Sequence, residues 1–369
     1  MKKARVLEII GKRPVGGVGT VMLNYQTYVD AEKVQMDYLI FGEEAENFDE
    51  AVKALGSKVY MYPALSGSQM GRTKAYLEEF FSQHAAEYDI VHLHAPNIAF
   101  LAFPIVAKYG IKHRIVHSHA TLYAENKIKA IRNQILWALA KGKITDRIGC
   151  SKAAGDFLFG KDGAEFTVLK NAIAYDEYLY DATLREAVRE REGVTGKLVV
   201  GNVGRFSQQK NQTRLVEIFA KVKELQPDSV LWLVGDGELR SEIEEKIKEL
   251  HLEKDVKLFG MVKNTKELYQ AMDVMVMPSL FEGLPMVGVE AQASGLPCVF
   301  SDAITREVDV VGCPYLSLEE SAEVWAKATI EATGKKERRS YPEELDVLGF
   351  NIKLEAKRLE DLYLDMQNR

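Results

Sequence analysis

The chain has 369 residues, more than one ordinary hydrophobic core holds, and this length predicts two domains with a site between them. Its 47% hydrophobic and 28% charged residues are typical of a soluble globular protein, without low-complexity tracts or fixed-period repeats. The net charge of −6 is uneven, because residues 1–171 carry 22 basic and 18 acidic side chains and the rest carry 26 and 36. The acidic total argues against nucleic-acid binding.

The N-terminal stretch MKKARVLEIIG and the longest uncharged apolar run, residues 98–107, bear on the cellular compartment. Glu8 interrupts the first stretch, so we predict a first strand and not a signal peptide. The apolar run is far too short to span a bilayer. Three widely spaced cysteines, Cys150, Cys298 and Cys313, fit buried thiols in a reducing cytosol better than a disulfide framework or a zinc site. We therefore expect a cytoplasmic protein.

Short β-branched or aromatic runs alternate with longer segments of helical period, which is the pattern of parallel sheets with helical crossovers. A polar, charge-dense connection interrupts this alternation once. The sequence predicts an α/β protein of two doubly wound, Rossmann-like domains, 1–171 and 197–345, joined by a linker, 172–196, and followed by a C-terminal helix, 346–369, that packs back on one domain, with the N-terminal domain favoured. The expected strands are 5–10, 38–41, 59–62, 90–94, 114–119, 147–150, 167–169, 198–203, 230–234, 256–259, 274–277 and 298–301, and helices are expected at 211–225 and 238–250.

Ligands of open parallel sheets bind beyond the carboxyl ends of the strands, and the first loop there reads GKRPVGGVGT. It lacks the Lys-Ser/Thr of a P-loop, and Met22 stands where a dinucleotide fingerprint has its third glycine. Glu43 would be the ribose acid of a nicotinamide-binding site, which we keep as a minor alternative beside a purely structural turn. The favoured interpretation is a flexible loop at Gly16 and Gly17 that lies against a ligand.

Four of the seven histidines form two alternating pairs, His92 with His94 and His117 with His119, each at the end of a strand. Residues i and i+2 share a face of a strand, so the pairs could supply metal ligands, but no nearby carboxylate or cysteine completes a site and we expect no metal. Strand-end histidines satisfied by hydrogen bonds are the simplest interpretation. The functional one places His119 of HSHA in the crevice, where an imidazole can bind a hydroxyl or phosphate.

The stretch from Lys108 to Arg147 holds nine basic and two acidic residues. Within it, ENKIKAIRNQILWALAKGK interleaves aliphatic and basic residues, which indicates a basic amphipathic helix. One interpretation is an ordinary helix that packs on the core and has a solvated basic face. The other is a helix that docks on anionic lipid headgroups through four cations, Lys127, Lys129, Arg132 and Lys141.

GNVGRFSQQKNQ, at the first strand of the second domain, sets Arg205 and Lys210 at the mouth of a parallel sheet, before a helix that Asn211 would cap. Two cations in this position suit a diphosphate, the Arg by a forked contact and the Lys as a compact charge. On charge alone, a pair of solvated surface cations is an equal alternative.

SLFEGLPMVGVEAQASGLP sets Glu282 in a loop and Glu290 inside the following helix, which is expected to begin at Pro285 and stop at Gly295. The free amides just after Gly283 favour an anion. Buried carboxylates need partners. The two acids therefore serve either as a helix-dipole acid and a structural salt bridge or as ligand-binding groups.

Together these motifs resemble glycosyltransferase family 4, which are retaining transferases of GT-B fold with nucleotide-sugar donors. The resemblance lies in the G-R-x-x-x-x-K-N arrangement at 204–211 and the E-x7-E arrangement at 282–290, and it extends to VHSHA, CSKAAGDFLFG, LKNAI and VGDGELR, nearly the whole chain. GGVGTVMLNY and EAQASGLPCVFSD resemble bacterial capsular and exopolysaccharide glycosyltransferases. The resemblance implies two domains that face each other across a cleft.

The resemblance also implies roles at the donor site. Arg205 and Lys210 match the pair that neutralises the donor diphosphate, Glu290 matches the acid that binds the ribose hydroxyls, and Glu282 matches the acid that contacts the donor sugar. The chain departs from the family pattern at SDAITREV, where many relatives have a glycine pair before the final acid, so no role is assigned to Glu307.

Further positions are carried over in the same way. The amides of Gly283 and Leu284 would line the sugar and phosphates, and the backbone near Met261 would meet the base. Gly16–Gly17 matches the mobile loop over the diphosphate, and His119 matches the histidine near the transferred sugar.

The implied reaction moves a hexose from a nucleotide-sugar, with a UDP-sugar favoured, to a hydroxyl of a glycan or lipid-linked glycan in cell-surface polysaccharide synthesis. The nucleoside diphosphate is an activated leaving group, so cations and helix amides would stabilise its charge without a metal or other cofactor. No nucleophilic carboxylate is identified on the acceptor side, which favours front-face attack over double displacement. The acceptor is expected on the N-terminal domain, with the basic helix on the inner face of the cytoplasmic membrane.

Two alternatives stay open. One is a sugar-nucleotide epimerase or hydrolase of the same fold, and the other is a non-catalytic subunit that binds a sugar nucleotide. The complete set of two cations and two acids argues against the second. The sequence leaves open the base, sugar, acceptor, linkage and oligomeric state.

Overall fold

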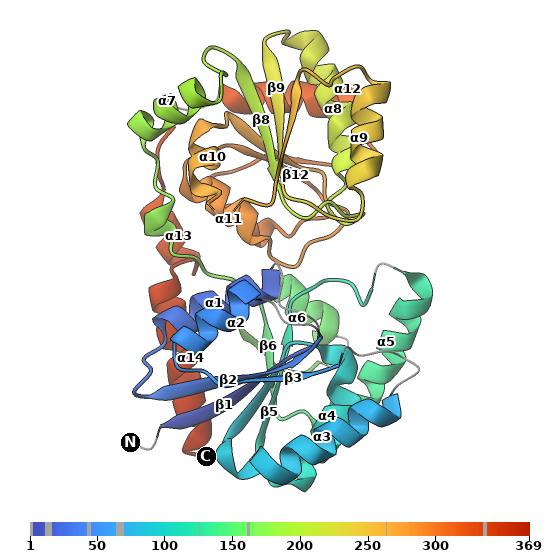
Figure 1. Cartoon of the computed structure of the whole chain (residues 1–369), viewed down its shortest axis with the longest axis vertical. Helices are drawn as coiled ribbons and strands as arrows, with labels where there is room; N and C mark the ends of the chain where they lie inside the picture. Colours follow the sequence, from blue (N-terminus) through green and yellow to red (C-terminus); the bar gives the residue numbers. More distant parts are fainter. Residues whose placement is uncertain are drawn as a thin grey trace. The chain divides into compact units, whose positions relative to one another are not determined.

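The computed structural model describes residues 3–11, 17–42, 46–63, 70–124, 126–160, 163–262, 264–334 and 338–369. The chain forms two units, each built around its own parallel sheet (Figure 1). Unit 1 combines Met1–Ala172 with Asn351–Arg369, and unit 2 is Ile173–Phe350. The predicted α/β architecture with two parallel sheets is therefore confirmed.

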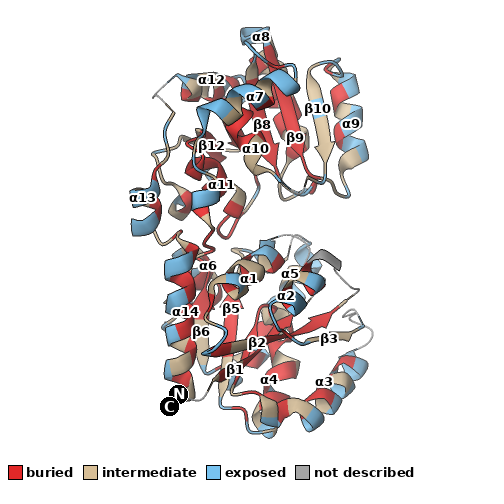
Figure 2. Ribbon diagram, turned by 60° about the vertical axis from the view of Figure 1, so that its left-hand side comes forward, coloured by how far each residue is buried: buried red, intermediate tan, exposed pale blue. Residues whose placement is uncertain are grey.

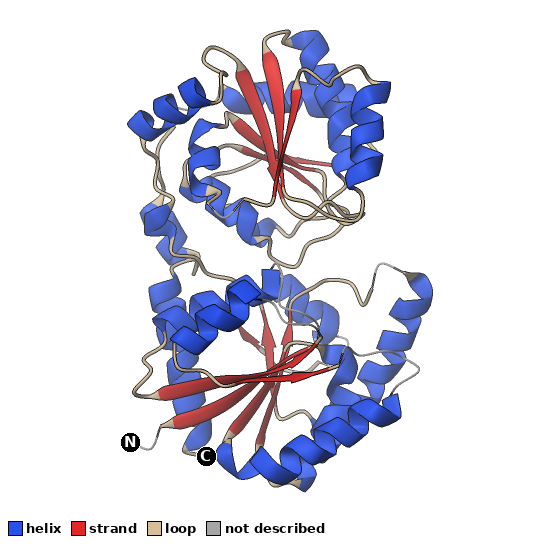
Figure 3. Ribbon diagram, viewed as in Figure 1, coloured by secondary structure: helices blue, strands red, loops and turns tan. Residues whose placement is uncertain are grey.

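Unit 1 holds a seven-stranded sheet in the order β3-β2-β1-β4-β5-β6-β7, with helices on both faces (Figure 3). The strand order reverses between β1 and β4, and this switch point is where open parallel sheets bind ligands. The strands are β1 (Ala4–Ile10), β2 (Val34–Phe41), β3 (Val59–Tyr62), β4 (Ile90–Leu93), β5 (His113–Ser118), β6 (Asp146–Gly149) and β7 (Thr167–Val168), and the helices are α1 (Gly17–Tyr28), α2 (Glu46–Ala54), α3 (Met70–His84), α4 (Ala99–Lys108), α5 (Lys127–Ala140), α6 (Lys152–Leu158) and α14 (Ile352–Gln367).

The alternation of side chains along β1 separates the core of unit 1 from its polar centre. Leu7 and Ile9 belong to one apolar cluster with Phe80 of α3 and Phe103 of α4. Successive residues of a strand point to opposite faces, so Glu8 faces the other way. Its carboxylate accepts a hydrogen bond from the hydroxyl of Tyr363 in α14, at 2.9 Å.

Unit 2 holds a six-stranded parallel sheet in the order β10-β9-β8-β11-β12-β13. Its central strands are buried, as the red colour of β8, β9 and β12 in Figure 2 shows, whereas β10 at the edge is half-buried and drawn in tan. The strands are β8 (Leu198–Val203), β9 (Ser229–Val234), β10 (Val256–Gly260), β11 (Val274–Met277), β12 (Cys298–Ser301) and β13 (Tyr315–Leu316), and the helices are α7 (Ala182–Arg191), α8 (Gln212–Leu225), α9 (Arg240–Glu249), α10 (Lys266–Ala271), α11 (Met286–Ala293), α12 (Ala322–Thr333) and α13 (Pro342–Val347).

All twelve predicted strands are present, with ends that differ by a few residues. The strand that the sequence did not predict, β13, has two residues, and so short an edge strand leaves no periodic signal.

The predicted linker, 172–196, contains helix α7, which packs on α10 of unit 2. Asp181 caps the helix by accepting a hydrogen bond from the amide of Leu184 at 3.0 Å. Arg185 and Arg189 then pair with Asp273 at the start of β11. These ion pairs attach the segment to unit 2.

Helix α14 packs on unit 1, as the prediction favoured, through contacts with α1, β1, β2 and β4. Asn351 caps it, and its buried stripe, visible in Figure 2, consists mainly of apolar residues, Ile352, Ala356, Leu359, Tyr363 and Met366.

Candidate active site

The loops after β8 and β9 lie against each other at the carboxyl edge of the unit 2 sheet. A Cβ atom at Gly235, where φ is +136°, would lie 2.0 Å from the carbonyl oxygen of Gly204, and one at Gly237 would lie 2.3 Å from that of Phe206. No side chain fits at either position, so these glycines of VGDGELR allow a close contact between two backbones. That contact fixes the loop that carries Arg205.

Both predicted cations of this edge face carboxylates. The Arg205 side chain is 72% exposed and its guanidinium lies 2.9 Å from the carboxylate of Glu238. Lys210 is different, because only 16% of its side chain is exposed and its Nζ lies 2.6 Å from Oε1 of Glu282. The interpretation as a solvated surface cation fits Arg205 in this structure but not Lys210.

Asn211 occupies the N-cap position of α8, but it does not cap the helix as the sequence suggested. Its backbone lies in the left-handed region, with φ at 56°, and its side-chain amide donates to the carbonyl of Pro278 at 3.1 Å. Asn tolerates this conformation better than most residues. The side chain thus ties the start of α8 to the end of β11, which brings Lys210 close to the loop that carries Glu282.

Glu282 is anchored by both its side chain and its backbone. Its carboxylate accepts hydrogen bonds from Lys210 Nζ and, at 3.2 Å, from Nε2 of Gln209. Its backbone forms a bridge with Ile304, after β12. The sequence did not predict Gln209 as a site residue, although it is adjacent to the predicted Lys210.

Glu290 is buried in α11, and the hydroxyl of Tyr269 donates to its Oε2 at 2.8 Å. Burial raises the pKa of the Glu290 carboxyl, while hydrogen bonds from Tyr269 and Tyr178 and the charges of Lys266 and Lys210 oppose the rise. Lys210 thus pairs with Glu282, whereas Glu290 is held by tyrosine hydroxyl groups. Neither tyrosine was predicted, since each lies on a different element from the motif.

Helix α11 begins one residue after the predicted Pro285 and ends at Ala293, two residues before the predicted stop at Gly295. Leu284, just before the helix, is buried, as is Gly283. Gly295 has φ +66°, and a Cβ there would lie 2.2 Å from the backbone carbonyl of Arg339. The stop is thus fixed by packing as well as by conformation.

The remaining predicted positions are dispersed. Met261 follows β10 and is 74% exposed. Glu307 lies in a short 3₁₀ turn, where its amide donates to the hydroxyl of Thr305 at 3.3 Å. Gly17 opens α1, whereas Gly16 and the considered Glu43 lie outside the described residues.

In unit 1 the four histidines gather at the carboxyl ends of β4 and β5. The rings of His117 and His119 are stacked with centroids 4.0 Å apart, and those of His92 and His94 are 4.4 Å apart. Burial lowers the pKa of every one of these imidazoles, that of His94 to about 3, so all four are neutral at neutral pH.

A carboxylate that the sequence did not connect with these histidines completes the cluster. Oε2 of Glu8 lies 2.8 Å from Nε2 of His94 and 3.4 Å from Nδ1 of His92. Burial raises the pKa of Glu8 to about 8, against the lowering effect of the hydrogen bond from Tyr363. The expectation that no carboxylate is near the histidines is therefore wrong, because Glu8 comes from a strand far away in sequence.

Within the described ranges, one trio of potential metal ligands, His92, His94 and His117, has nitrogens within 4.8 Å of one another. Both nitrogens of His94 already contact Glu8 and His119, and the rings of His92 and His117 are parallel within 9°. Both ring nitrogens of His94 are therefore already engaged in hydrogen bonds in this arrangement.

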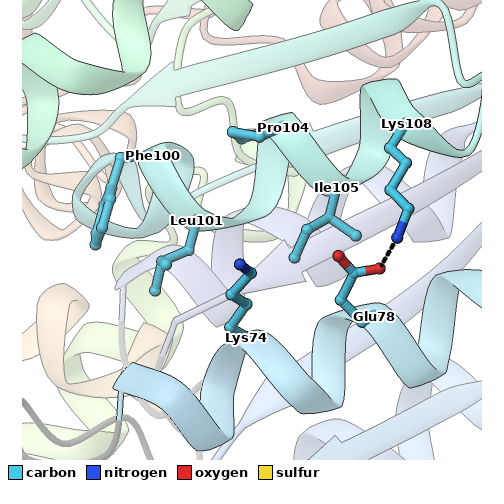
Figure 4. Close-up of a pocket in the computed structure, with 7 residues that line it drawn as sticks. All are labelled: Lys74, Glu78, Phe100, Leu101, Pro104, Ile105 and Lys108. Carbon is cyan, nitrogen blue, oxygen red and sulfur yellow. Dashed lines mark hydrogen bonds and ion pairs between the residues drawn. The ribbon is translucent and has the colours of Figure 1, made fainter.

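A groove of about 350 Å³ lies elsewhere on unit 1, between α3 and α4 (Figure 4). A salt bridge of 2.7 Å between Lys108 and Glu78 closes one end of it. The groove shares no residue with the predicted site, and it is lined by Lys74, Glu78, Phe100, Leu101, Pro104, Ile105 and Lys108.

Comparison with known proteins places these features in context. Residues 185–340 match the family model described as glycosyl transferases group 1. The putative glycosyltransferase EpsF of Bacillus subtilis is 33% identical, over 97% of this chain and 96% of that protein. The UDP-Gal:alpha-D-GlcNAc-diphosphoundecaprenol alpha-1,3-galactosyltransferase of Escherichia coli is 28% identical, over 76% of each chain.

Among solved structures, HepE of Anabaena in complex with UDP and glucose superposes with a TM-score of 0.75 at 18% identity, over 99% of this chain and 97% of that one. Two doubly wound units of this kind make up the GT-B fold. Within that fold, the similarity to EpsF over nearly the whole length decides the family. The chain belongs to the glycosyl transferases group 1.

Proposed function

We propose that this glycosyltransferase moves a hexose from a UDP-sugar to a hydroxyl group of a lipid-linked glycan, with retention of configuration and without a metal. The observation that carries the proposal is Lys210, held by Glu282 at the carboxyl edge of a parallel sheet. The name of the E. coli relative, which gives UDP-Gal as donor and a diphosphoundecaprenol-linked acceptor, supports this choice of substrates.

Lys210 is the central charge for the donor diphosphate. An ammonium group has three hydrogens to donate, and the contact with Glu282 uses one of them. The others serve phosphate oxygens. Arg205 joins by exchanging Glu238 for a phosphate, and because that ion pair is exposed, the exchange costs little.

Glu290 binds the ribose hydroxyls. Tyr269 is fully buried and its hydroxyl donates to one oxygen of the carboxylate, whereas Tyr178, which also forms a hydrogen bond with Glu290, is half-buried. Ribose hydroxyls that donate to the carboxylate favour its charged form and so offset the effect of burial.

The leaving diphosphate gains negative charge as the glycosidic bond breaks, and Lys210, Arg205 and the amides of Gly283 and Leu284 stabilise it. The acceptor hydroxyl then attacks the donor sugar from the same face that the diphosphate leaves, and the departing phosphate takes the proton of that hydroxyl. The family resemblance assigns Met261 to the base, the glycine loop at positions 16 and 17 to the diphosphate, and His119 to the transferred sugar, and the proposal keeps these roles.

Incubation of the purified chain with a panel of UDP-, GDP- and ADP-sugars tests the proposal. A thermal shift with UDP-sugars is expected, since a ligand of the folded state stabilises it by mass action. Consumption of UDP-sugar only with a lipid-linked acceptor, and a product with the anomeric configuration of the donor, supports transfer. Consumption without any acceptor supports the epimerase or hydrolase, and binding without turnover supports the non-catalytic subunit.

Helix α5 supports a proposal about the acceptor. Its inner face packs through Trp137 and Ala140, but four aliphatic side chains point outward, with exposed fractions of 58% to 80%: Ile128, Ile131, Ile135 and Leu139. These positions are spaced by three or four residues and form one stripe opposite the buried face. The helix packs on the core, and its exposed face is aliphatic as well as basic.

We propose that this stripe inserts into the headgroup region of an anionic bilayer. Five cations and no acidic residue occur from Asn126 to Thr145, which complements anionic lipid. No helix in the described part of the chain is long and apolar enough to cross a membrane. Docking would place the protein on the inner face of the cytoplasmic membrane, next to a lipid-linked acceptor.

Sedimentation with anionic vesicles tests α5. Serine at the four aliphatic positions is expected to abolish binding, and glutamine at Lys127, Lys129, Arg132 and Lys141 is expected to weaken it and remove its salt dependence. Val347→Ser and Leu354→Ser, at exposed aliphatic positions elsewhere, serve as controls. Unchanged sedimentation of both α5 variants would exclude this surface.

A further inference from the structure

Three side chains, of which Glu8 and His94 are buried and His119 is half-buried, form a continuous line in unit 1, from the middle of the sheet to the predicted sugar-contacting histidine. Oε2 of Glu8 lies 2.8 Å from Nε2 of His94, and Nδ1 of His94 lies 2.8 Å from Nε2 of His119. The far nitrogen of His119, Nδ1, is buried and has no hydrogen-bond partner among the residues that the structure describes. The line therefore ends at a polar atom whose hydrogen-bonding capacity no described residue uses.

Other titratable groups also face Glu8. They are Tyr38 of β2, His92 of β4 and Tyr363 of α14. The Tyr363 hydroxyl donates to Oε1 of Glu8 and also lies 2.6 Å from Nδ1 of His92. This leaves Oε2 as the oxygen that exchanges a hydrogen with His94.

The hydrogen positions along this line are linked, because a neutral imidazole carries one hydrogen on one of its two nitrogens. When Glu8 is protonated, it donates to Nε2 of His94, His94 donates from Nδ1 to Nε2 of His119, and His119 presents an N–H at Nδ1. When Glu8 is ionised, each hydrogen bond reverses, and Nδ1 of His119 presents a lone pair. Ionisation moves each hydrogen one step along the line and releases one proton at His119.

We propose that Glu8, acting through His94, decides which nitrogen of His119 carries the hydrogen, and that Glu8 is therefore a positioning residue for sugar transfer. This inference rests on the proposed function, which assigns His119 to the transferred sugar. Oxygen atoms of a sugar or a diphosphate accept hydrogen bonds, so the form with N–H at Nδ1 is the productive one.

The direction of the pH dependence follows. Burial raises the pKa of Glu8 to about 8, so the carboxyl group is protonated and His119 is a donor at neutral pH. Above that pH, Glu8 ionises and Nδ1 of His119 turns a lone pair toward the ligand. Turnover should therefore fall as pH rises through the pKa of Glu8, while the four imidazoles stay neutral.

The first test reads the hydrogen positions directly. In protein labelled with ¹⁵N-histidine, the ring nitrogen shifts of His119 should report hydrogen on Nδ1 at about pH 6 and on Nε2 at about pH 9.5. Glu8→Gln keeps an amide donor toward His94, so it should hold hydrogen on Nδ1 at both pH values. A wild-type tautomer that does not change with pH, or one that changes equally in Glu8→Gln, would overturn the inference. This readout needs no turnover, so it separates failure of the inference from failure of the proposed function.

The second test is the pH profile of kcat/KM. Wild-type kcat/KM should fall about tenfold per pH unit above the pKa of Glu8, and Glu8→Gln should remove that fall while keeping wild-type activity below it. Tyr363→Phe removes the hydrogen bond that lowers the pKa of Glu8, so the fall should move to higher pH. Glu87→Gln, at an acid outside the cluster, is the control. A wild-type fall that persists in Glu8→Gln would show that Glu8 is merely structural.

Discussion

Lys210→Gln separates the two tasks assigned to this lysine, which are to balance the charge of Glu282 and to bind the donor diphosphate. The Nζ to Oε1 distance is 2.6 Å, and only 16% and 8% of the two side chains are exposed. Removing one partner of a buried ion pair costs about 3–5 kcal/mol. Gln209 still donates to Glu282, so we expect the low end, about 3 kcal/mol of unfolding free energy.

UDP affinity should fall in the same variant by about 1.5–3 kcal/mol, or roughly 10–150-fold, because a charge-assisted hydrogen bond to phosphate is lost. The double variant Lys210→Gln, Glu282→Gln replaces the ion pair by two amides that can bind each other. It should recover most of the stability but none of the UDP affinity.

Chemical denaturation measures the stability of these variants, and calorimetric titration measures their affinity for UDP. If the double variant bound UDP as tightly as the wild type, Lys210 would serve only to neutralise Glu282 and the diphosphate role would be refuted. Recovery of stability alone supports both tasks.

Three further predictions concern the framework. Asp273→Asn removes the carboxylate that pairs with Arg185 and Arg189, and it should lower the free energy of unfolding by about 3 kcal/mol, which is a fall of roughly 6–12 °C in Tm. An unchanged Tm would mean that α7 is held by apolar contacts alone. Gly235→Ala should cost about 2–3 kcal/mol or more and weaken UDP binding, because its Cβ meets the backbone of the loop after β8; Gly334→Ala, which faces open space, is the control. Burial raises the folded-state pKa of Glu8 to about 8, so its contribution to stability is complete below about pH 4.5 and is lost as pH rises through about 8. The free energy of unfolding, measured by chemical denaturation across this range, should decline in the wild type but not in Glu8→Gln.

The architecture could be predicted because each strand and helix has a local sequence pattern of its own. Buried strands of a parallel sheet read as short apolar runs, such as VMVM at 274–277, and each was recognised without knowledge of its neighbours. Edge strand β13 was missed because two residues carry no pattern.

The site was only partly predictable, because its partners come from distant elements. Lys210 and Glu282 lie in recognisable motifs, but their pairing depends on the side chain of Asn211, which ties α8 to β11 instead of capping the helix. Glu8 is 86 residues from His94 in sequence, and it looked like an interruption in an apolar strand. Only the order of the strands brings them together.

The outward stripe of α5 shows a different limit. The sequence gives the amphipathic period but not which face is buried, because both aliphatic and basic residues recur at helical spacing. In the structure, the face that carries Trp137 packs on the core, so the aliphatic stripe is exposed.

The central claim is that Glu290 and Glu282 have separate tasks at one nucleotide-sugar, the first at the ribose and the second at the sugar. Calorimetric titration of Glu290→Ala and Glu282→Ala with free UDP, beside their turnover of UDP-sugar, tests it most directly. Glu290→Ala should weaken UDP binding roughly tenfold or more, whereas Glu282→Ala should bind UDP within about threefold of the wild type and lose turnover. Equal losses of UDP affinity in the two variants, or a wild-type chain that does not bind UDP, would contradict the account.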